Sequence, residues 1–322
     1  MSTPPNRSSS PPTAWNNAPT AAHQAYDYAV LDVFAESPLA GNALAVFSDA
    51  RGLSTEEMQA LARETNLSET TFILPRPPEI ERERGVQVRI FTVAEELEFA
   101  GHPTLGTAAW LHLNHPALAG SQAITLDLRV GQIPVTFALQ QSGLGVFGTM
   151  RQKDPVFGQV HDRAEVARAI GMAIGDLDPD LPIQTVSTGM PFCIVPLRSL
   201  DVAARLAVPQ TLAQAYLAQT DARFFHCITR ADTAATGAHW HARMQFYNGE
   251  DPATGSASGC AIAYLVRHSL AASDERIAIE QGVEMLRPSR IYVSASRDGD
   301  RVSNVQVGGR TIPVATGRFF LP

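Results

Sequence analysis

Apolar residues in this chain fall mostly into short runs separated by Gly, Pro, Asn and Asp, a pattern typical of strands joined by turns. Helical patterns lie between these runs without a regular strand–helix–strand order. A mixed or antiparallel sheet is therefore favoured over a repeated βαβ sheet, and the fold class we expect is α+β. The predicted strands cover 28–34, 43–47, 70–74, 86–92, 123–129 and 133–139 in the first half, and 183–186, 192–197, 224–230, 241–247, 277–281, 289–294 and 304–307 in the second.

Five segments are predicted to be helices, of which one has an amphipathic pattern and two are apolar almost throughout. Ser54 and Glu57 have the spacing of a capping box, which predicts an amphipathic helix from there to about Thr65, and further helices are predicted over 163–170 and 209–219. The two apolar helices run to about His112 and Val266, after a predicted turn at 101–104 and a loop at 248–252. A helix that is apolar all round is buried on every side, so each should be central in its part of the molecule.

The two apolar helices are preceded by similar motifs. His102-Pro-x-x-Gly-Thr-Ala and Asp251-Pro-x-x-Gly-Ser-Ala share one pattern, and nearly half of the chain separates them. The repeat indicates two similar halves, each with its strands wrapped around one central helix. We place the domains at 25–150 and 151–322, with strands that can be exchanged across the boundary. A disordered tail over 1–24, dense in Pro, Ser, Asn and Thr, precedes them.

Composition excludes several classes of protein. The chain has 322 residues, 45% hydrophobic and 18% charged, which fits roughly two globular domains. Its apolar stretches are shorter than the ~20 residues of a membrane-spanning helix. A net charge of −7 without a basic cluster argues against nucleic acid or an acidic membrane as partner. Three separated cysteines and no secretory or transit signal make the cytoplasm the expected location.

Helix starts suggest where a ligand could bind. Unpaired backbone N–H groups and a partial positive charge at a helix N-terminus favour a carboxylate or phosphate, so two facing termini would make a small anionic-ligand site. Each polar residue has a simpler alternative. Asp251 could only cap its helix, and His102 could be a structural or solvated histidine. The glycines near both motifs could serve turns and close packing alone.

Glu69 is the third candidate, because it precedes an apolar strand. A carboxyl group there can be partly desolvated, which raises its pKa toward the range of a general acid or base, although it could also be a surface residue at a strand edge. The sequence lacks a P-loop, a serine-hydrolase elbow, a dinucleotide fingerprint and metal-ligand spacing of His and Cys. We therefore expect neither a cofactor nor a metal.

Five motifs together resemble one family, the PhzF-like isomerases of phenazine biosynthesis. In chain order they are Asn66-Leu-Ser-Glu69-Thr-Thr-Phe72, Phe99-Ala-Gly-His102-Pro-Thr-Leu-Gly106, Ser187-Thr-Gly-Met-Pro-Phe192, Glu250-Asp251-Pro-Ala-Thr-Gly-Ser256-Ala257, and Gln281-Gly282 followed by Arg287-Pro-Ser289. The resemblance implies a homodimer and a diaminopimelate-epimerase-like fold. In that fold, two pseudo-symmetric domains each form a barrel-like sheet around a central helix, and the active site lies in the cleft between them. The resemblance also implies a small carboxylated substrate, of the type of 2,3-dihydro-3-hydroxyanthranilate, isomerised by proton movement without metal or cofactor.

The resemblance also assigns site residues. The family's proton-shuttling glutamate matches Glu69, its pocket histidine and aspartate match His102 and Asp251, and its substrate contacts match Ser68, Gly101, Gly255 and Ser256. Diaminopimelate epimerases place a thiol before each of the two helix-start glycines, where this chain has Ala100 and Thr254. A two-cysteine racemase mechanism is thereby disfavoured. This chain also has Gly41-Asn42-Ala43 where PhzF-like proteins often have Gly-Asn-Pro.

The resulting hypothesis is a cofactor-independent isomerase in which Glu69 moves a proton within a small carboxylated substrate. One alternative is a PhzF-like scaffold that binds a metabolite or a protein without catalysis, because a fold does not fix a function. Another is an amino-acid epimerase that uses Glu69 and a second acid.

Overall fold

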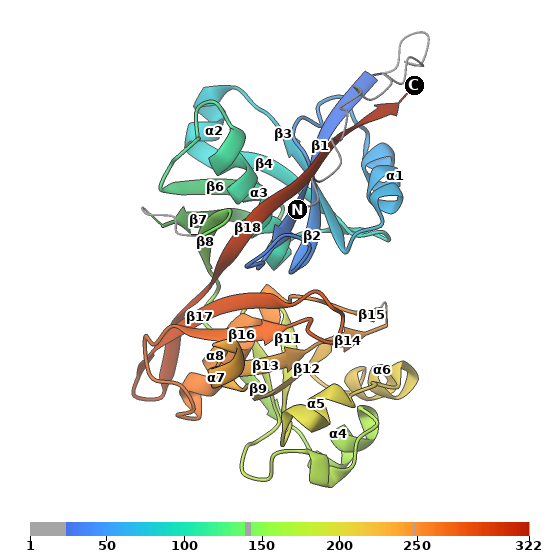
Figure 1. Ribbon diagram of the computed structural model, residues 1–322, viewed down its shortest axis with the longest axis vertical. Helices are drawn as coiled ribbons and strands as arrows, with labels where there is room; N and C mark the ends of the chain where they lie inside the picture. Colours follow the sequence, from blue (N-terminus) through green and yellow to red (C-terminus); the bar gives the residue numbers. More distant parts are fainter. Residues whose placement is uncertain (1–23, 139–142, 248, 322) are drawn as a thin grey trace, which may run out of the picture.

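The computed structural model describes residues 24–138, 143–247 and 249–321, and it has two lobes that lie one above the other in Figure 1. The predicted fold class is confirmed: each lobe is a mixed sheet packed around one buried helix. Of the predicted 1–24 tail, only Gln24 is described, and it is the first residue of a strand. Residue 139 of one predicted strand and Asn248 of the predicted loop lie outside the described residues.

The first lobe is a closed barrel of eight strands. Its pairing order is β1-β2-β3-β4-β6-β7-β8-β18, and β18 closes the ring by pairing antiparallel with β1. A short strand, β5 (Glu96–Leu97), pairs with β4. The barrel strands are β1 (Gln24–Val33), β2 (Asn42–Phe47), β3 (Glu69–Leu74), β4 (Val86–Phe91), β6 (Ala123–Leu128), β7 (Gly131–Phe137), β8 (Val146–Arg151) and β18 (Arg301–Leu321).

The helix α3 (Gly101–Asn114) fills this barrel. It contacts seven of the eight strands, β1, β2, β3, β6, β7, β8 and β18, and ten of its 14 residues are buried. Two helices lie outside the barrel: α1 (Thr55–Thr65), whose predicted capping box between Ser54 and Glu57 is present, and α2 (Pro78–Arg84). The expectation that an all-round apolar helix is central is confirmed here.

The second lobe repeats the arrangement around α8 (Gly255–Arg267), which contacts β10, β11, β12, β17 and β18. The sheet order from β18 outward is β17-β16-β13-β12-β11-β10-β9. Helices α4, α5 and α6 cover its outer face with a second apolar cluster. The remaining elements are β9 (Val156–Val160), β10 (Gln184–Ser187), β11 (Pro191–Pro196), β12 (Phe224–Arg230), β13 (Trp240–Arg243), β14 (Gln245–Phe246), β15 (Gly249–Glu250), β16 (Ile277–Gln281), β17 (Ser289–Asp298), α4 (Arg163–Ala169), η1 (Ile174–Asp176), α5 (Leu200–Ala204), α6 (Gln210–Leu217) and α7 (Thr233–Thr236).

The strand β18 joins the lobes. Its first part pairs with β17 in the lower lobe, and its later part pairs with β8 and β1 in the upper lobe, as the dark red ribbon of Figure 1 shows. The sequence predicted only 304–307 of this strand. It also predicted no strand in the Gly-rich segment around 143–154, where β8 lies and pairs with β7 and β18. The domain boundary after residue 150 stays a prediction.

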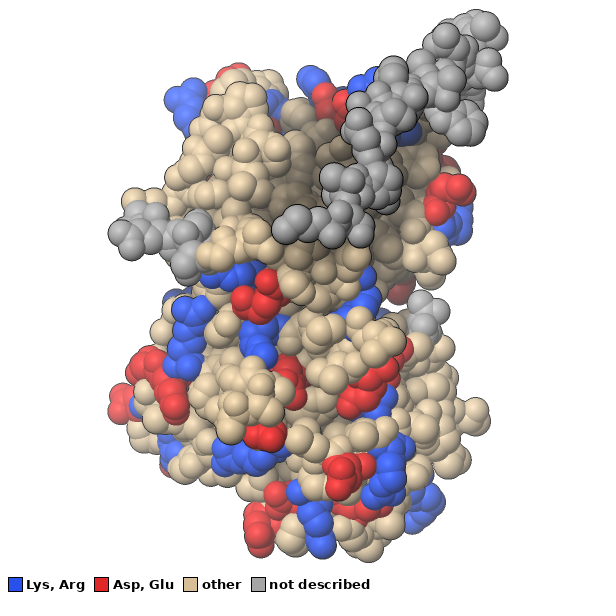
Figure 2. Space-filling view, in the orientation of Figure 1, with Lys and Arg blue, Asp and Glu red and all other residues tan. Residues whose placement is uncertain are grey.

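The molecular surface matches the charge pattern of the sequence. Figure 2 shows acidic and basic side chains intermixed on the visible face of the lower lobe, with no large field of one sign there. Among the helices of the described residues, none is both long enough and apolar enough to cross a bilayer.

Candidate active site

The N-termini of α3 and α8 meet where the two lobes join. Gly101 and Gly255 are the first residues of the two helices, and a Cβ added to Gly101 would lie 3.3 Å from the backbone nitrogen of Ser256. Within the described residues, neither N-cap, Ala100 or Thr254, bonds its helix through a side chain. Both termini therefore direct unpaired N–H groups and partial positive charge into one small region, which suits a carboxylate.

The helix starts correct two sequence expectations. The predicted turn at 101–104 is the first turn of α3, so His102 is a helical residue rather than a loop residue. The N-cap of α8 is Thr254, so Asp251 lies before the helix and the capping alternative for its side chain is wrong. The repeated motif aligns Gly106 with Gly255, but the residues that begin the two helices are Gly101 and Gly255. The motif therefore does not mark equivalent positions in the two helices.

Glu69 lies at the start of β3, directly after the chain leaves α1. Asn66, in the left-handed conformation with φ of 50°, ends α1 and turns the chain toward the strand. The side chain of Glu69 is 17% exposed, but its Oε2 atom is buried and lies 3.4 Å from His102 Nε2. Neither of these two atoms has a hydrogen-bond partner among the described residues. An unpaired buried polar pair of this kind is costly, and such pairs occur at functional sites.

Burial shifts the pKa values of Glu69 and His102 in opposite directions. Burial, assisted by the charge of Asp251, raises the pKa of Glu69 to about 8. Burial lowers the pKa of His102 to about 3. Desolvation disfavours the charged form of each group, so near neutral pH Glu69 is mostly protonated and His102 is neutral. The contact between Glu69 and His102 is therefore not an ion pair.

Asp251 is held from both sides. Its Oδ1 accepts a hydrogen bond of 2.7 Å from Asn42 Nδ2, and its Oδ2 accepts one of 2.6 Å from the Thr254 hydroxyl. Burial raises the pKa of Asp251 to about 6, against the opposing effect of these two hydrogen bonds. The carboxylate is thus mainly ionised at pH 7, and Gln281 fixes the backbone by donating to the Asp251 carbonyl at 2.7 Å.

The proposed substrate contacts lie around the same point with different exposure. Gly101 and Gly255 are buried at the helix starts, Ser256 is half-buried in the first turn of α8, and Ser68 is exposed just before Glu69. The structure therefore brings Glu69, His102, Asp251, Gly101, Gly255 and Ser256 to the lobe junction, with Ser68 at its outer edge.

Two glutamines and an arginine that support the site had no assigned role in the sequence analysis. Gln152 donates to the Gly255 carbonyl at 3.0 Å and accepts from Thr188 at 2.6 Å, so it ties the Ser-Thr-Gly-Met-Pro motif to α8. Arg287 donates to the Gly41 carbonyl at 2.9 Å. Gln281 and Arg287 lie in a motif of the family resemblance, and that motif is the sequence signal that could have identified them. Gln152 is in none of them.

Asn42 is the most informative residue that the sequence analysis passed over. It is the first residue of β2 and only 1% exposed, and its side-chain amide lies between His102, Asp251 and Ala253. The sequence singled it out only through the Ala43 that follows it. Its partners are 60, 209 and 211 residues away along the chain, so no local pattern could show them.

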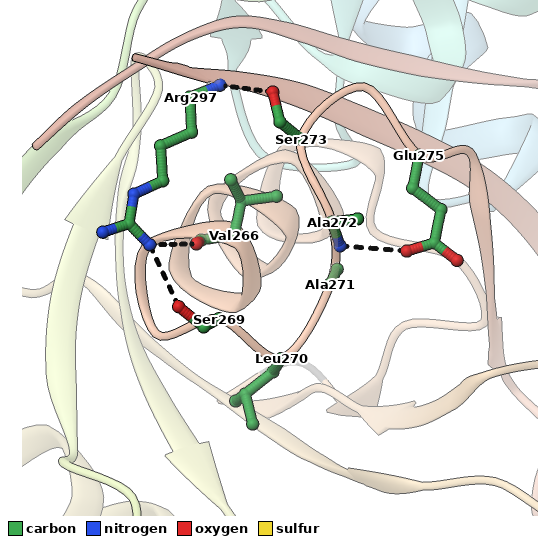
Figure 3. Close-up of a pocket in the computed structure, with 8 residues that line it drawn as sticks. All are labelled: Val266, Ser269, Leu270, Ala271, Ala272, Ser273, Glu275 and Arg297. Carbon is green, nitrogen blue, oxygen red and sulfur yellow. Dashed lines mark hydrogen bonds between the residues drawn. The ribbon is translucent and has the colours of Figure 1, made fainter. Parts of the chain in front are cut away.

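A separate pocket of about 360 Å³ lies at the other end of α8 (Figure 3). Its polar groups bond one another: Arg297 donates to the Val266 carbonyl and to Ser269, and Glu275 accepts from the backbone of Ala272. We assign these contacts to closing the C-terminal end of the helix. In the described parts of the chain, no three His, Cys, Asp or Glu residues form a group that could hold a metal ion.

Solved structures define the class of this fold. A hydroxyproline epimerase from Agrobacterium vitis matches with a TM-score of 0.61 at 10% identity, covering 92% of this chain and 93% of that one. A PhzF-family phenazine biosynthesis protein from Bacillus anthracis matches with a TM-score of 0.81 at 27% identity, covering 92% of this chain and all of that one (100%). The molecule thus has the two-lobed fold of the diaminopimelate-epimerase-like class.

Within that class, the chain belongs to the phenazine biosynthesis-like protein family, whose model matches residues 31–317. It is 38% identical over 298 residues to the trans-2,3-dihydro-3-hydroxyanthranilate isomerase of Pseudomonas aeruginosa, covering 91% of this chain and 99% of that one. A second isomerase of that name, from Pseudomonas chlororaphis, is 34% identical over 301 residues, covering 92% of this chain and 100% of that one. The protein is a PhzF-family isomerase, as the five motifs predicted.

Proposed function

We propose that this isomerase moves a proton between two carbon atoms of a small carboxylated substrate, with Glu69 as the group that carries it. The observation that supports this most is the state of the Glu69 carboxyl, buried at Oε2 and with a pKa raised to about 8. A general acid–base works best when its pKa is near the working pH, because both protonation states are then accessible. Such a group contributes about 10²- to 10⁴-fold in rate.

The surrounding groups suit a substrate carboxylate. The N–H groups at the starts of α3 and α8, with the Ser256 hydroxyl, offer donors in a region of positive potential. His102 and the ionised Asp251 are placed to hold polar substituents next to the reacting carbons. In the reaction, one C–H bond breaks, its proton passes through Glu69, and a C–H bond forms at another carbon. The elemental composition is unchanged and no electrons leave the substrate, so the step needs no cofactor.

The substrate class that we propose follows from the relatives. Two relatives are trans-2,3-dihydro-3-hydroxyanthranilate isomerases, and the first matches this chain at 38% identity over nearly its whole length. We therefore propose this compound, or a close carboxylated analogue, as substrate. The homodimer that the resemblance implies stays a prediction, which sedimentation of the purified protein tests.

An epimerase is less well supported by the helix starts. The two positions before Gly101 and Gly255 are the helix N-caps, and Ala100 and Thr254 occupy them. Neither side chain can act as a base opposite the other, so the two-thiol arrangement of a diaminopimelate epimerase has no counterpart here. A scaffold without catalysis does not account for the unpaired Glu69 and His102, which are costly to bury.

The test compares Glu69→Gln with wild type on trans-2,3-dihydro-3-hydroxyanthranilate in deuterated water, following product and isotope by mass spectrometry. We expect turnover by the wild type and a loss of about 10²- to 10⁴-fold in the variant. Glu64→Gln, an exposed glutamate on α1, is the matched control and should retain activity. Full turnover by Glu69→Gln would refute the role of Glu69. If the wild type bound the compound tightly without converting it, the non-catalytic scaffold would be favoured. If an amino acid instead exchanged its α-hydrogen for deuterium at a single carbon, the epimerase would be favoured.

A further inference from the structure

Three polar atoms surround the side-chain amide nitrogen of Asn42. Its Nδ2 lies 2.7 Å from Asp251 Oδ1, 3.1 Å from the Ala253 carbonyl oxygen and 3.3 Å from His102 Nδ1. A backbone carbonyl oxygen can only accept a hydrogen bond, so the atom that faces Ala253 must be the NH2 nitrogen and not the amide oxygen. The amide orientation is thereby fixed by its surroundings.

This orientation determines which nitrogen of His102 carries the proton. A neutral imidazole has one N–H and one lone pair, and His102 is neutral because burial opposes its charge. Its Nδ1 lies 3.3 Å from the amide nitrogen of Asn42, which can donate but not accept a hydrogen bond, so an Nδ1–H would place donor against donor. The lone pair therefore lies on Nδ1 and the proton on Nε2, the atom 3.4 Å from Glu69 Oε2.

The position of that proton bears on Glu69. The N–H of His102 Nε2 points at Oε2, so a proton bound to Oε2 would place two donors against each other. A protonated Glu69 therefore carries its proton on Oε1. Oε2 is buried, whereas the side chain as a whole is 17% exposed, so Oε1 is the oxygen that a substrate can reach. The 3.4 Å separation is long for a hydrogen bond, and such contacts often shorten when substrate binds.

We propose that Asn42 is a positioning residue that locks His102 in the Nε2–H tautomer, so that Glu69 presents its transferable proton to substrate on Oε1. This inference rests on the proposed role of Glu69. Asn42 acts on the site through His102 and Asp251, and it serves both lobes, because His102 lies in the first turn of the upper central helix and Asp251 precedes the lower one.

The experiment reads the tautomer directly. Wild-type protein with ¹⁵N-labelled histidine rings is examined by NMR without substrate, with His102→Gln to assign the signal. We expect an unprotonated Nδ1 and a protonated Nε2. Asn42→Asp replaces the donor by a carboxylate acceptor of the same shape and should shift the proton to Nδ1. Its kcat should fall by up to about 10⁴-fold, the loss seen when the histidine of a catalytic triad is held in the wrong tautomer.

Controls distinguish the proposed positioning role of Asn42 from a merely structural role, and they test it separately from the proposed function. Asn114→Asp, an exposed asparagine at the end of α3, should change neither the tautomer nor kcat. An Nδ1–H tautomer in the wild type would overturn the inference even if Asn42→Asp failed to fold. A tautomer unchanged in a folded Asn42→Asp variant would overturn it as well. If either of these results is obtained and Glu69→Gln is inactive, the Asn42 inference fails but the proposed function stands. If Glu69→Gln is active, the proposed function fails, and the Asn42 inference that rests on it fails too.

Discussion

At the scale of single residues, one physical effect sets the state of the site. Removal from water disfavours the charge of an acid and of a base alike, so the pKa of Glu69 is raised to about 8 and that of His102 is lowered to about 3. Asp251 differs, because Asn42 and Thr254 donate hydrogen bonds to its carboxylate and oppose the effect of burial. Near neutral pH the carboxyl group of Glu69 is therefore mostly protonated, whereas that of Asp251 is mainly ionised.

The raised pKa of Glu69 predicts a pH-dependent free energy of unfolding. The folded state binds this proton more tightly than the unfolded chain does, so the stabilising contribution is complete below pH 4.5 and is lost as pH rises through about 8. The full loss is about 5 kcal/mol, of which about 3 kcal/mol falls between pH 6 and pH 9. In urea unfolding at pH 6 and pH 9, Glu69→Gln should lose less stability than wild type over this interval. Equal losses in the two proteins, with Glu64→Gln as control, would contradict the raised pKa.

The residues of the site were recoverable from the sequence to different degrees. Glu69, His102 and Asp251 lie in motifs that are contiguous in the chain, so the resemblance found them. Asn42 lies in a short Gly-Asn turn whose meaning depends on partners 60 and 209 residues away. A contact between distant segments leaves no periodic signal, and only the fold shows it.

At the scale of elements, the close fit of α3 within its barrel depends on small residues. A Cβ added to Gly106 would lie 2.6 Å from Leu44 Cδ2 and 2.7 Å from Val33 Cγ2, and both of these side chains are fully buried. Contacts below 3.0 Å require a neighbour to move, and a close-packed interior leaves it little room. The helix can approach β1 and β2 because this position has no side chain.

Gly106→Ala should therefore lower the free energy of unfolding by about 1–3 kcal/mol, despite the better helix propensity of alanine. Gly175→Ala in η1 is the control, because a Cβ there has nothing within 4 Å. Thermal and urea unfolding of both variants measure the difference. A Gly106→Ala protein as stable as the control would show that Leu44 and Val33 can repack around the added methyl group.

The elements that the sequence predicted correctly have strong local signals. The capping box at Ser54 and the apolar periodicity after it gave α1 almost to the residue. The sequence missed several elements, among them α2 and β9. Most of β18 and all of β8, which it also missed, contain residues that disfavour strands, such as Gly148, Gly308 and Pro313. These segments are strands because β17, β8 and β1 pair with them, so tertiary pairing overrides local propensity.

At the scale of the whole molecule, the lobes are joined by β18 and by a polar cross-link beside the site. Arg287 of the lower lobe donates to Asp32 Oδ1 at 2.7 Å and to the Ala40 carbonyl at 2.8 Å in the upper lobe. Asp32 is 1% exposed, and its other oxygen accepts from the backbone of Leu39. This cross-link holds the turn that leads into Asn42, so it couples the arrangement of the lobes to the site.

Arg287→Met should lower the free energy of unfolding by about 3–5 kcal/mol, because it leaves the buried Asp32 carboxylate without its charged partner. It should also lower kcat, since the Gly41–Asn42 turn loses its anchor. Adding Asp32→Asn should restore part of the stability, because the unpaired charge is then gone. Arg63→Met, an exposed arginine at the end of α1, is the control. Chemical denaturation and steady-state kinetics report both effects, and an Arg287→Met variant with unchanged stability and kcat would contradict the coupling.

The sequence by itself determined the type of most elements, the two central helices and the family, and it singled out the three principal candidate site residues. These follow from periodicity and from short contiguous motifs, which are local properties of a chain. The tertiary structure alone decided the strand that joins the lobes, the meeting of the two helix starts, the Asn42 contacts and the opposite pKa shifts of Glu69 and His102. Each of these depends on which distant segments exclude water from one another, and burial is a property of the folded molecule rather than of any segment.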